Sequence, residues 1–196
     1  MLDRGAGRLA RLYGYFGVSH LCENLPPNAR IFDAGAGLSD FGHAVAAKSE
    51  DIIWINFDVR YDMPDLSHDN KTKLESLRAR ASSNLTYVAR DVLNLPDQML
   101  EQPFDCGFSY YMFPHIIDNF GLKRSRLAME NVLKLIQRGG LFHTGPSRYL
   151  DEGWTVTVPE QSQIKKLAAD MVKRYVESWD SYEKRVEKDR AASLHS

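Results

Sequence analysis

Apolar residues along this chain occur in two alternating patterns, short continuous runs and stretches with helical spacing. Continuous runs such as Ile52–Ile55 and Cys106–Phe108 are typical of strands covered on both faces, as in a parallel sheet. Strands are predicted at Arg30–Ala34, Ile52–Asp58, Leu85–Ala89, Phe104–Tyr110 and Gly140–Thr144. Helices are predicted at Leu38–Lys48, Lys71–Ala81, Pro96–Glu101 and Leu122–Gln137. This alternation predicts an α/β fold of three layers around a doubly wound, mostly parallel sheet.

The C-terminal part departs from this alternation. One further strand is predicted at Trp154–Val158, followed by a long amphipathic helix over Glu160–Arg190. Apolar residues recur in that helix at steps of three and four from Ile164 to Val186. The simplest interpretation is a helix packed on its own domain, and the alternative is a surface for a homodimer or another partner. Its basic residues are interleaved with acids, which disfavours a nucleic-acid role.

The N-terminal segment Gly7–Glu23 has apolar residues at helical spacing, interrupted by glycines. Tyr13–Gly17, together with His20, suggests a hinged lid over a bound ligand, because glycines flank the aromatic residues. The alternative is a short helix packed on the sheet. We expect a single domain with three parts, an N-terminal helical segment at 1–28, the sheet domain at 29–159 and the C-terminal helix at 160–196.

Composition narrows the class of protein and the compartment in which it is expected. The 196 residues are 43% hydrophobic and 26% charged, which is ordinary for a soluble globular domain. The formal net charge of -1 argues weakly against a broad nucleic-acid surface. The two cysteines make no disulfide framework, and Cys106 is expected to be a buried thiol. With no apolar run of membrane-spanning length and no secretory signal, a cytoplasmic location is expected.

A glycine turn carries the first chemical signal. Asp33-Ala-Gly-Ala-Gly37 follows a predicted strand and precedes a predicted helix. The glycines permit a tight turn and a close approach of the backbone to a ligand. Asp40 stands where a dinucleotide-binding turn has its third glycine. Two carboxylates around the turn disfavour a pyrophosphate and suit a cation such as a sulfonium or an ammonium group.

Acidic residues also end the next two strands. Asp58 closes the second strand, about twenty residues after the turn, where a carboxylate can accept both ribose hydroxyls. Asp91 follows the third strand and is placed to accept from an adenine amino group, with the Val92 backbone as a donor to the ring. Each acid alone could be a solvated loop residue or a helix cap. Three acids at the ends of successive strands favour one shared site.

In these segments the chain resembles the class I S-adenosylmethionine-dependent methyltransferases, over about Ala29–Gly145. The resemblance rests on five segments in the family's order, Arg30–Gly37, Phe57-Asp58, Arg90–Pro96, Phe104–Tyr110 and Asn131–Phe142. It implies the Rossmann-like methyltransferase fold and S-adenosylmethionine as cofactor. Two departures stand out. Ser39 replaces a frequent third glycine, and one predicted strand replaces the antiparallel strand pair that usually follows the fifth strand.

The resemblance implies a role for each of these strand ends. Asp33 and the backbone of Gly35 and Gly37 would hold the methionine end of the cofactor. Asp58 would bind the ribose, and Asp91 with Val92 the adenine. Ser109 and Tyr110 would line the floor beneath the sulfonium.

Methyl transfer is an in-line displacement in which the cofactor carries the reactive group, so a base is needed only for a hydroxyl or protonated amine acceptor. His115 is a candidate general base, with a structural role near a helix start as the alternative. His143 is expected to be structural. Tyr110 and Tyr111 are candidates for the acceptor pocket, or for core filling. The histidines and cysteines lack metal-ligand spacing, so no metal site is expected.

The predicted function is therefore methyl transfer from S-adenosylmethionine. The near-neutral charge and the lack of an Asn-Pro-Pro-Tyr motif favour a small-molecule acceptor over nucleic acid. The alternatives are a methyltransferase acting on protein or RNA, and a non-catalytic scaffold or regulatory protein with the same fold. A nicotinamide-dependent oxidoreductase is disfavoured by Asp33 and Asp40. These motifs do not identify the acceptor, because specificity in such folds lies in loops and added segments.

Overall fold

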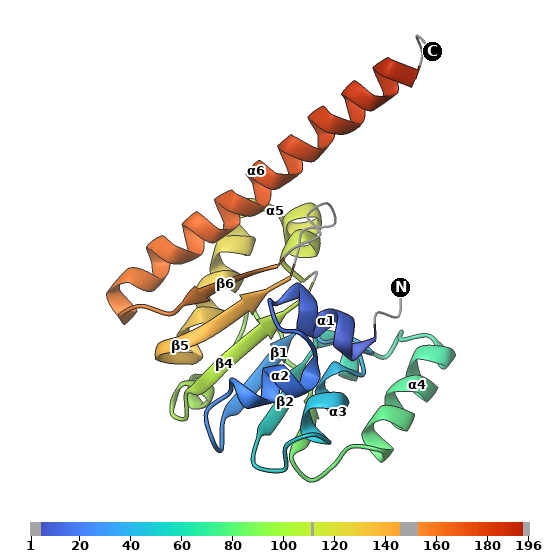
Figure 1. Cartoon of the computed structure of the whole chain (residues 1–196), viewed down its shortest axis with the longest axis vertical. Coiled ribbons are helices and arrows are strands. Elements are labelled where there is room, and N and C mark those ends of the chain that lie inside the picture. The colour runs from blue at the N-terminus through green and yellow to red at the C-terminus, as the bar shows by residue number, and fades with distance from the viewer. Residues whose placement is uncertain (1–4, 111, 146–152, 194–196) are drawn as a thin grey trace.

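A computed structural model describes residues 5–110, 112–145 and 153–193, with the side chains of all of these except 97 and 179–193. These residues form a six-stranded sheet in the order β3-β2-β1-β4-β5-β6 (Figure 1). The strands are β1 Arg30–Ala34, β2 Ile53–Phe57, β3 Leu85–Val88, β4 Phe104–Ser109, β5 Ile136–Thr144 and β6 Trp154–Thr157. Strands β1 to β5 pair in parallel and β6 is antiparallel to β5, which confirms the predicted doubly wound sheet.

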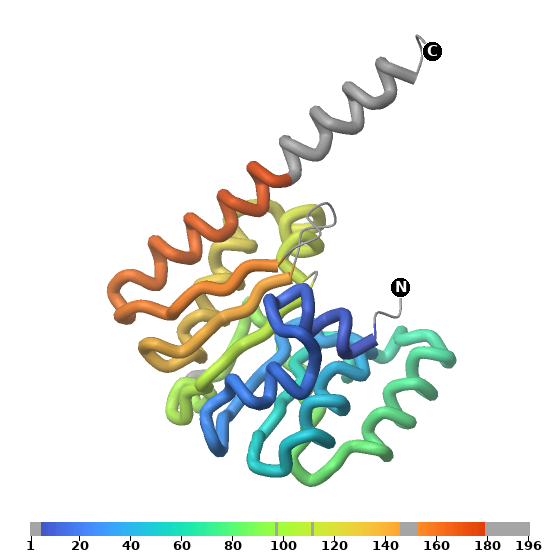
Figure 2. The backbone as a smooth tube through the Cα atoms, in the orientation of Figure 1, coloured from blue at the N-terminus to red at the C-terminus, as the bar shows by residue number. Residues whose placement is uncertain are grey.

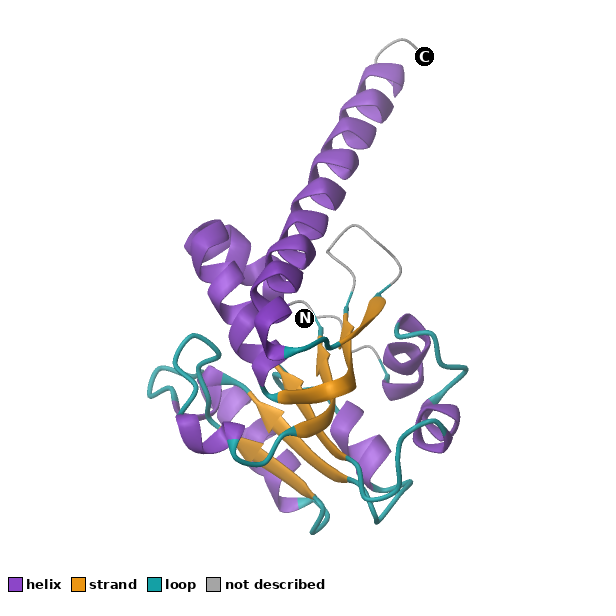
Figure 3. Cartoon of the chain, turned by 90° about the vertical axis from the view of Figure 1, so that its left-hand side faces the viewer, coloured by secondary structure: helices purple, strands orange, loops and turns teal. Residues whose placement is uncertain are grey.

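Helices cover both faces of the sheet, so the predicted three layers are present (Figure 3). The α-helices are α1 Ala6–Leu12, α2 Val18–Glu23, α3 Phe41–Ala46, α4 His68–Ala79, α5 Met112–Lys134 and α6 Gln161–Ser193. Two short 3₁₀ helices, η1 Val59–Asp62 and η2 Asp97–Leu100, follow β2 and β3. One apolar core lies between the sheet and α5 with α6, and a second lies between the sheet and α1 to α3.

The region around β5 differs from the prediction. The helix expected at Leu122–Gln137 begins earlier, at Met112, bends at Gly121 and ends at Lys134. The fifth strand begins at Ile136 rather than Gly140. Its pairing with β4 is irregular between Phe104 and Cys106. Gly139 and Gly140, where the strand was predicted to begin, therefore lie inside a bulge. Glycine disfavours strands locally, and pairing with β4 overrides that preference.

The C-terminal helix packs on its own domain along its first half. Ile164, Ala168, Met171, Val172 and Tyr175 of α6 are buried. The Tyr175 hydroxyl is hydrogen-bonded to the Thr144 hydroxyl and donates to the Gly145 carbonyl at 3.2 Å. The neighbour of this half is α5 (Figure 2). The alternative of a partner surface along 160–190 stays a prediction, and the side chains beyond Ser178 lie outside the described residues.

The N-terminal segment is folded against the sheet as well. The buried Tyr13 ring contacts Phe108 with 5.0 Å between ring centroids. The Tyr15 hydroxyl lies 3.2 Å from Nε2 of His143 on β5. These are the contacts of a helical segment packed on the sheet, the alternative to the predicted lid. Phe16 is the exception in this segment, because its side chain is 87% exposed.

Candidate functional site

The glycine turn after β1 is fixed by conformation and by packing. Gly35 and Gly37 have φ angles of 72° and 60°, a region that favours glycine. The Gly35 and Ala36 amides both donate to the Phe57 carbonyl, at 2.8 and 3.1 Å, which ties the turn to the end of β2. A Cβ atom added to Gly35 would lie 2.7 Å from Cβ of Met112, at the start of α5. The turn therefore needs glycine at position 35 for two independent reasons.

Asp33 is a buried carboxylate at the end of β1. Its exposed fraction is 4%, and Oδ1 has no hydrogen-bond partner among the described residues. Burial, and then the charge of Asp58, raise the pKa of Asp33 to about 7. A buried charge without a partner is costly. This position is therefore suited to a cationic group that would pair with the ionised carboxylate.

Asp58 lies against the glycine turn. Its Oδ2 accepts from the Gly37 amide at 2.9 Å, although the two residues are 21 positions apart. Its Oδ1 accepts from the Arg60 amide at 2.9 Å and so caps η1. The Arg60 guanidinium binds both carboxylate oxygens, with Nε 2.9 Å from Oδ1 and Nη2 2.7 Å from Oδ2. The Tyr61 hydroxyl donates to the Gly37 carbonyl at 2.7 Å, which joins η1 to the turn a second time.

The end of β4 contributes Ser109 and Tyr110. Asp33 pairs with Phe108 across β1 and β4, so Ser109 lies next to the end of β1. Ser109 is buried, and its Oγ has no hydrogen-bond partner among the described residues. Tyr110 is partly buried and packs on Gly145, where an added Cβ would lie 2.6 Å from Cδ2 of the tyrosine ring. Tyr111, the other acceptor-pocket candidate, lies outside the described residues.

Asp91 is held within its own loop, whereas Val92 is bound to α5. The Asp91 carboxylate accepts from the Leu93 amide at 2.9 Å and from the Asn94 side chain at 2.8 Å. Val92 is buried, and its carbonyl accepts from the Asn131 side chain at 2.9 Å. No hydrogen bond within the described part of the chain joins Asp91 to the glycine turn. The geometry brings Asp33, Asp58 and Ser109 to one edge of the sheet, while the adenine role of Asp91 stays a prediction.

The two candidate histidines differ in environment. His115 is exposed on α5, one helical turn after Met112, with Nδ1 3.1 Å from Nδ2 of Asn119. His143 is buried, with Nδ1 2.7 Å from the Thr155 hydroxyl and its ring stacked on Phe108 at 4.6 Å. Burial lowers the pKa of His143 to about 4, so the ring is neutral at pH 7. These contacts are the structural role expected for His143.

Sequence reasoning missed three residues of this site, Arg60, Tyr61 and Met112. The signal for Arg60 was its spacing, two residues after the acid that ends β2, where its side chain can fold back onto that acid. Tyr61 and Met112 gave no comparable signal, because each contacts a glycine distant in the sequence.

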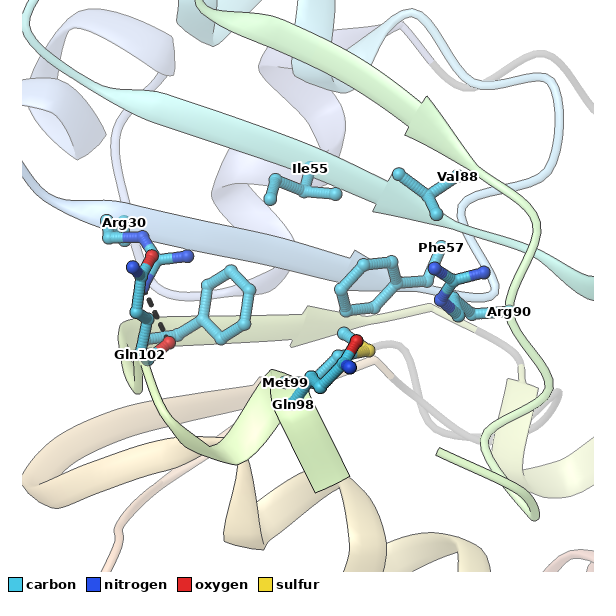
Figure 4. Close-up of a pocket in the computed structure, with 9 residues that line it drawn as sticks. Arg30, Ile55, Phe57, Val88, Arg90, Gln98, Met99 and Gln102 are labelled. Carbon is cyan, nitrogen blue, oxygen red and sulfur yellow. Dashed lines mark hydrogen bonds between the residues drawn. The ribbon is translucent and has the colours of Figure 1, made fainter. Parts of the chain in front are cut away.

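A cavity of about 230 Å³ lies on the face of the sheet that carries Phe57, the face covered by α5 and α6 (Figure 4). It lies beside η2, the single 3₁₀ turn found where the helix Pro96–Glu101 was predicted. Its lining contains two arginines and no acidic residue: Arg30, Ile55, Phe57, Val88, Arg90, Gln98, Met99, Gln102 and Phe104. None of the predicted site residues lines this cavity.

The described residues contain neither a cluster of metal ligands nor a membrane-spanning helix. No group of three or more His, Cys, Asp or Glu side chains there is arranged to hold a metal ion. No helix in the same part of the chain is long and apolar enough to cross a membrane. Both cysteines are free thiols, and Cys106 is buried as expected.

No family model and no curated protein matches this chain. Solved structures with a similar fold include coclaurine N-methyltransferase bound to N-methylheliamine and SAH, with 18% identity, 70% of this chain and 35% of that chain covered, and a TM-score of 0.48. An O-methyltransferase family protein from Burkholderia thailandensis has 11% identity, coverage of 70% and 37%, and a TM-score of 0.46. The YcgJ protein from Bacillus subtilis has 20% identity, coverage of 65% and 48%, and a TM-score of 0.44.

This chain therefore spans between about a third and a half of the length of these structures. At such identities the likeness is one of fold alone. The five parallel strands, with helices on both faces of the sheet, confirm the predicted α/β fold. In the described residues a single antiparallel strand pairs with β5, which is the departure from the family's strand pair that the sequence predicted.

Proposed function

We propose that this protein is an S-adenosylmethionine-dependent methyltransferase that transfers a methyl group to a small-molecule acceptor. The observation that carries the proposal is the Asp33 carboxylate, buried at the carboxyl end of β1 beside two glycines with positive φ angles. Ligands of open α/β sheets bind at this edge of the sheet. S-adenosylmethionine carries an ammonium and a sulfonium group, and either can pair with a carboxylate.

Two further features fit this cofactor. The Ser109 Oγ is a second buried polar atom without a hydrogen-bond partner among the described residues, on the strand next to Asp33. Asp58 is joined to the glycine turn through the Gly37 amide, so the acid proposed for the ribose and the turn proposed for the methionine end form one unit. A pyrophosphate is a poor fit, because both acids would repel it.

In this proposal the chain mainly binds and orients its ligands. The bound cofactor supplies an electrophilic methyl group. Asp33 would pair with the amino group of the methionine part, Asp58 would accept from the ribose hydroxyls, and Asp91 with Val92 would contact the adenine. Ser109 and Tyr110 would form the floor under the sulfonium. Orientation of this kind can supply a large part of the rate enhancement of a displacement reaction.

The class of cofactor is tested by isothermal titration calorimetry with S-adenosylmethionine, S-adenosylhomocysteine and NADH. Binding of the two adenosyl sulfur compounds and not of NADH supports the proposal. A protein that binds none of the three would instead fit the non-catalytic scaffold. Turnover needs a separate assay of S-adenosylhomocysteine formation with a panel of small hydroxyl and amine acceptors, alongside protein and RNA.

We expect Asp58→Ala to weaken binding of S-adenosylhomocysteine by about 1.5–3 kcal/mol, because hydrogen bonds to a charged acceptor are worth about this much. Calorimetry on the folded variant measures the change. Asp62→Ala is the matched control, since it removes an exposed carboxylate from the same 3₁₀ helix. Unchanged affinity in the Asp58 variant would remove this residue from the proposed site.

His115 is the proposed general base for acceptors that must lose a proton. Its replacement by alanine is expected to lower kcat by about 10²-fold, the lower end of what such a base contributes, with cofactor affinity retained. The control is His68→Ala, which removes a histidine at the start of α4. If the His115 variant turns over at the wild-type rate, the residue has only a structural role on α5.

A further inference from the structure

The Arg60 side chain uses the acceptor positions of Asp58 that a ribose would need. A carboxylate offers about four acceptor positions, two on each oxygen. In Asp58, Oδ1 accepts from the amide and Nε of Arg60, and Oδ2 accepts from the Gly37 amide and Nη2 of Arg60. All four positions are therefore occupied, and two of them are occupied by the guanidinium.

The guanidinium also lies on the glycine turn. A Cβ atom added to Gly37 would lie 2.9 Å from Nη2 of Arg60 and 3.9 Å from Oδ2 of Asp58. The Arg60 guanidinium therefore occupies the space where a side chain at position 37 would lie. The Asp58 side chain is 4% exposed, whereas that of Arg60 is 42% exposed and can turn toward solvent.

We infer that Arg60 limits the affinity for the cofactor by competing with its ribose for Asp58. This inference rests on the proposed function. A ribose diol that binds both oxygens of Asp58 must displace the guanidinium, while the amide bonds from Gly37 and Arg60 can remain. The competition lowers the affinity for any nucleoside that places a diol on Asp58.

The energetic scale of this competition is modest. A bidentate arginine–carboxylate pair has favourable geometry, but an ion pair with one partially exposed member is screened by solvent. Its loss is therefore expected to change affinity by about fivefold. A pair of this strength can be opened by a ligand that offers its own hydrogen bonds to a charged acceptor.

The test is calorimetric titration with S-adenosylhomocysteine of wild-type protein and the Arg60→Ala variant. We expect the variant to bind about fivefold more tightly, because Asp58 is then free to accept from the ribose. Arg60→Lys keeps the charge but loses the fork, so its affinity is expected between the two. It also provides a second variant if Arg60→Ala does not fold.

Two controls make the result specific. Arg78→Ala removes a positive charge of equal exposure beside Tyr61 and is expected to change affinity by less than about twofold. In an Asp58→Asn background, Arg60→Ala is expected to have no effect, because no carboxylate remains for the arginine to occupy. A gain in that background equal to the gain in the wild type would overturn the competition.

The outcomes separate the two proposals. If wild-type protein binds S-adenosylhomocysteine and Arg60→Ala binds no more tightly, the competition is wrong and the methyltransferase proposal stands. Weaker binding by Arg60→Ala would also overturn the competition, since the arginine would then contribute to the complex. If neither protein binds the ligand, both proposals fall.

Discussion

Asp33→Asn is expected to raise the free energy of unfolding by about 1–3 kcal/mol at pH 8. The wild-type carboxylate is ionised at that pH and buried, and burial raises its pKa from the usual value near 3.8 to about 7. A shift of one pKa unit corresponds to about 1.4 kcal/mol, so asparagine avoids a penalty of about 4 kcal/mol. It also buries an amide group whose unpaired N–H donors cost about 1–3 kcal/mol, which offsets part of the gain. Urea denaturation of both proteins at pH 8 measures the difference.

Asp33 makes stability depend on pH in the direction opposite to that of most carboxyl groups, whose pKa values are lowered by folding. Between pH 4 and pH 7 the folded state retains the Asp33 proton longer than the unfolded state does, so this residue lowers stability as pH rises. His143 acts in the opposite direction between about pH 4 and 6.5, because its lowered pKa makes the folded state bind the proton less tightly. Comparing Asp33→Asn with wild type across this range isolates the carboxylate, since His143 is common to both.

The pH dependence of ligand affinity should also report the ionisation of the Asp33 carboxylate. A cationic ligand that pairs with ionised Asp33 lowers the pKa of the carboxylate, so affinity for S-adenosylhomocysteine is expected to rise with pH up to about 7 and then level off. Asp33→Asn is expected to lose both this dependence and most of the affinity. Asp40→Asn, which removes a carboxylate that is 51% exposed, is the control and should retain both. A stable Asp33→Asn variant with wild-type affinity would exclude Asp33 from the ligand site.

Gly35→Ala is expected to lower the free energy of unfolding by about 2–5 kcal/mol. Alanine at a φ angle of 72° costs about 1–2 kcal/mol. The new methyl group would lie 2.7 Å from Cβ of Met112, and crowding in a packed region costs about another 1–3 kcal/mol. Equilibrium denaturation measures the loss, and binding of S-adenosylhomocysteine should fall with it.

Two variants separate these contributions. Gly14 has a φ angle of 86° and no atom within 4 Å of an added Cβ, so Gly14→Ala reports the cost of a positive φ angle without crowding. Adding Met112→Leu or Met112→Val to Gly35→Ala does not relieve the crowding, because the clash is with Cβ itself, whereas Met112→Gly removes that atom. Equal losses for Gly35→Ala and Gly14→Ala would show that α5 does not crowd the turn.

The fold could be predicted from the sequence to a large extent. The apolar runs of β1, β2 and β4 are continuous because both faces of these strands are covered, and this pattern is local. The positions of Asp33 and Asp58 at strand ends follow from the same pattern. The glycine turn could be predicted equally well, since only glycine adopts such φ angles at little cost.

The sequence alone thus determined that the candidate site residues lie at the ends of successive strands. It also determined the need for glycine in the turn and the acidic character of one edge of the sheet. Tertiary structure alone decided which groups meet there: the Arg60 guanidinium on Asp58, the start of α5 on Gly35, and the burial that raises the pKa of Asp33. It also decided that Ile136 is a strand residue, through pairing with Phe104. The physical reason is that periodicity and backbone preference act over a few residues, whereas burial, ion pairing and close packing depend on atoms that only the folded chain brings together.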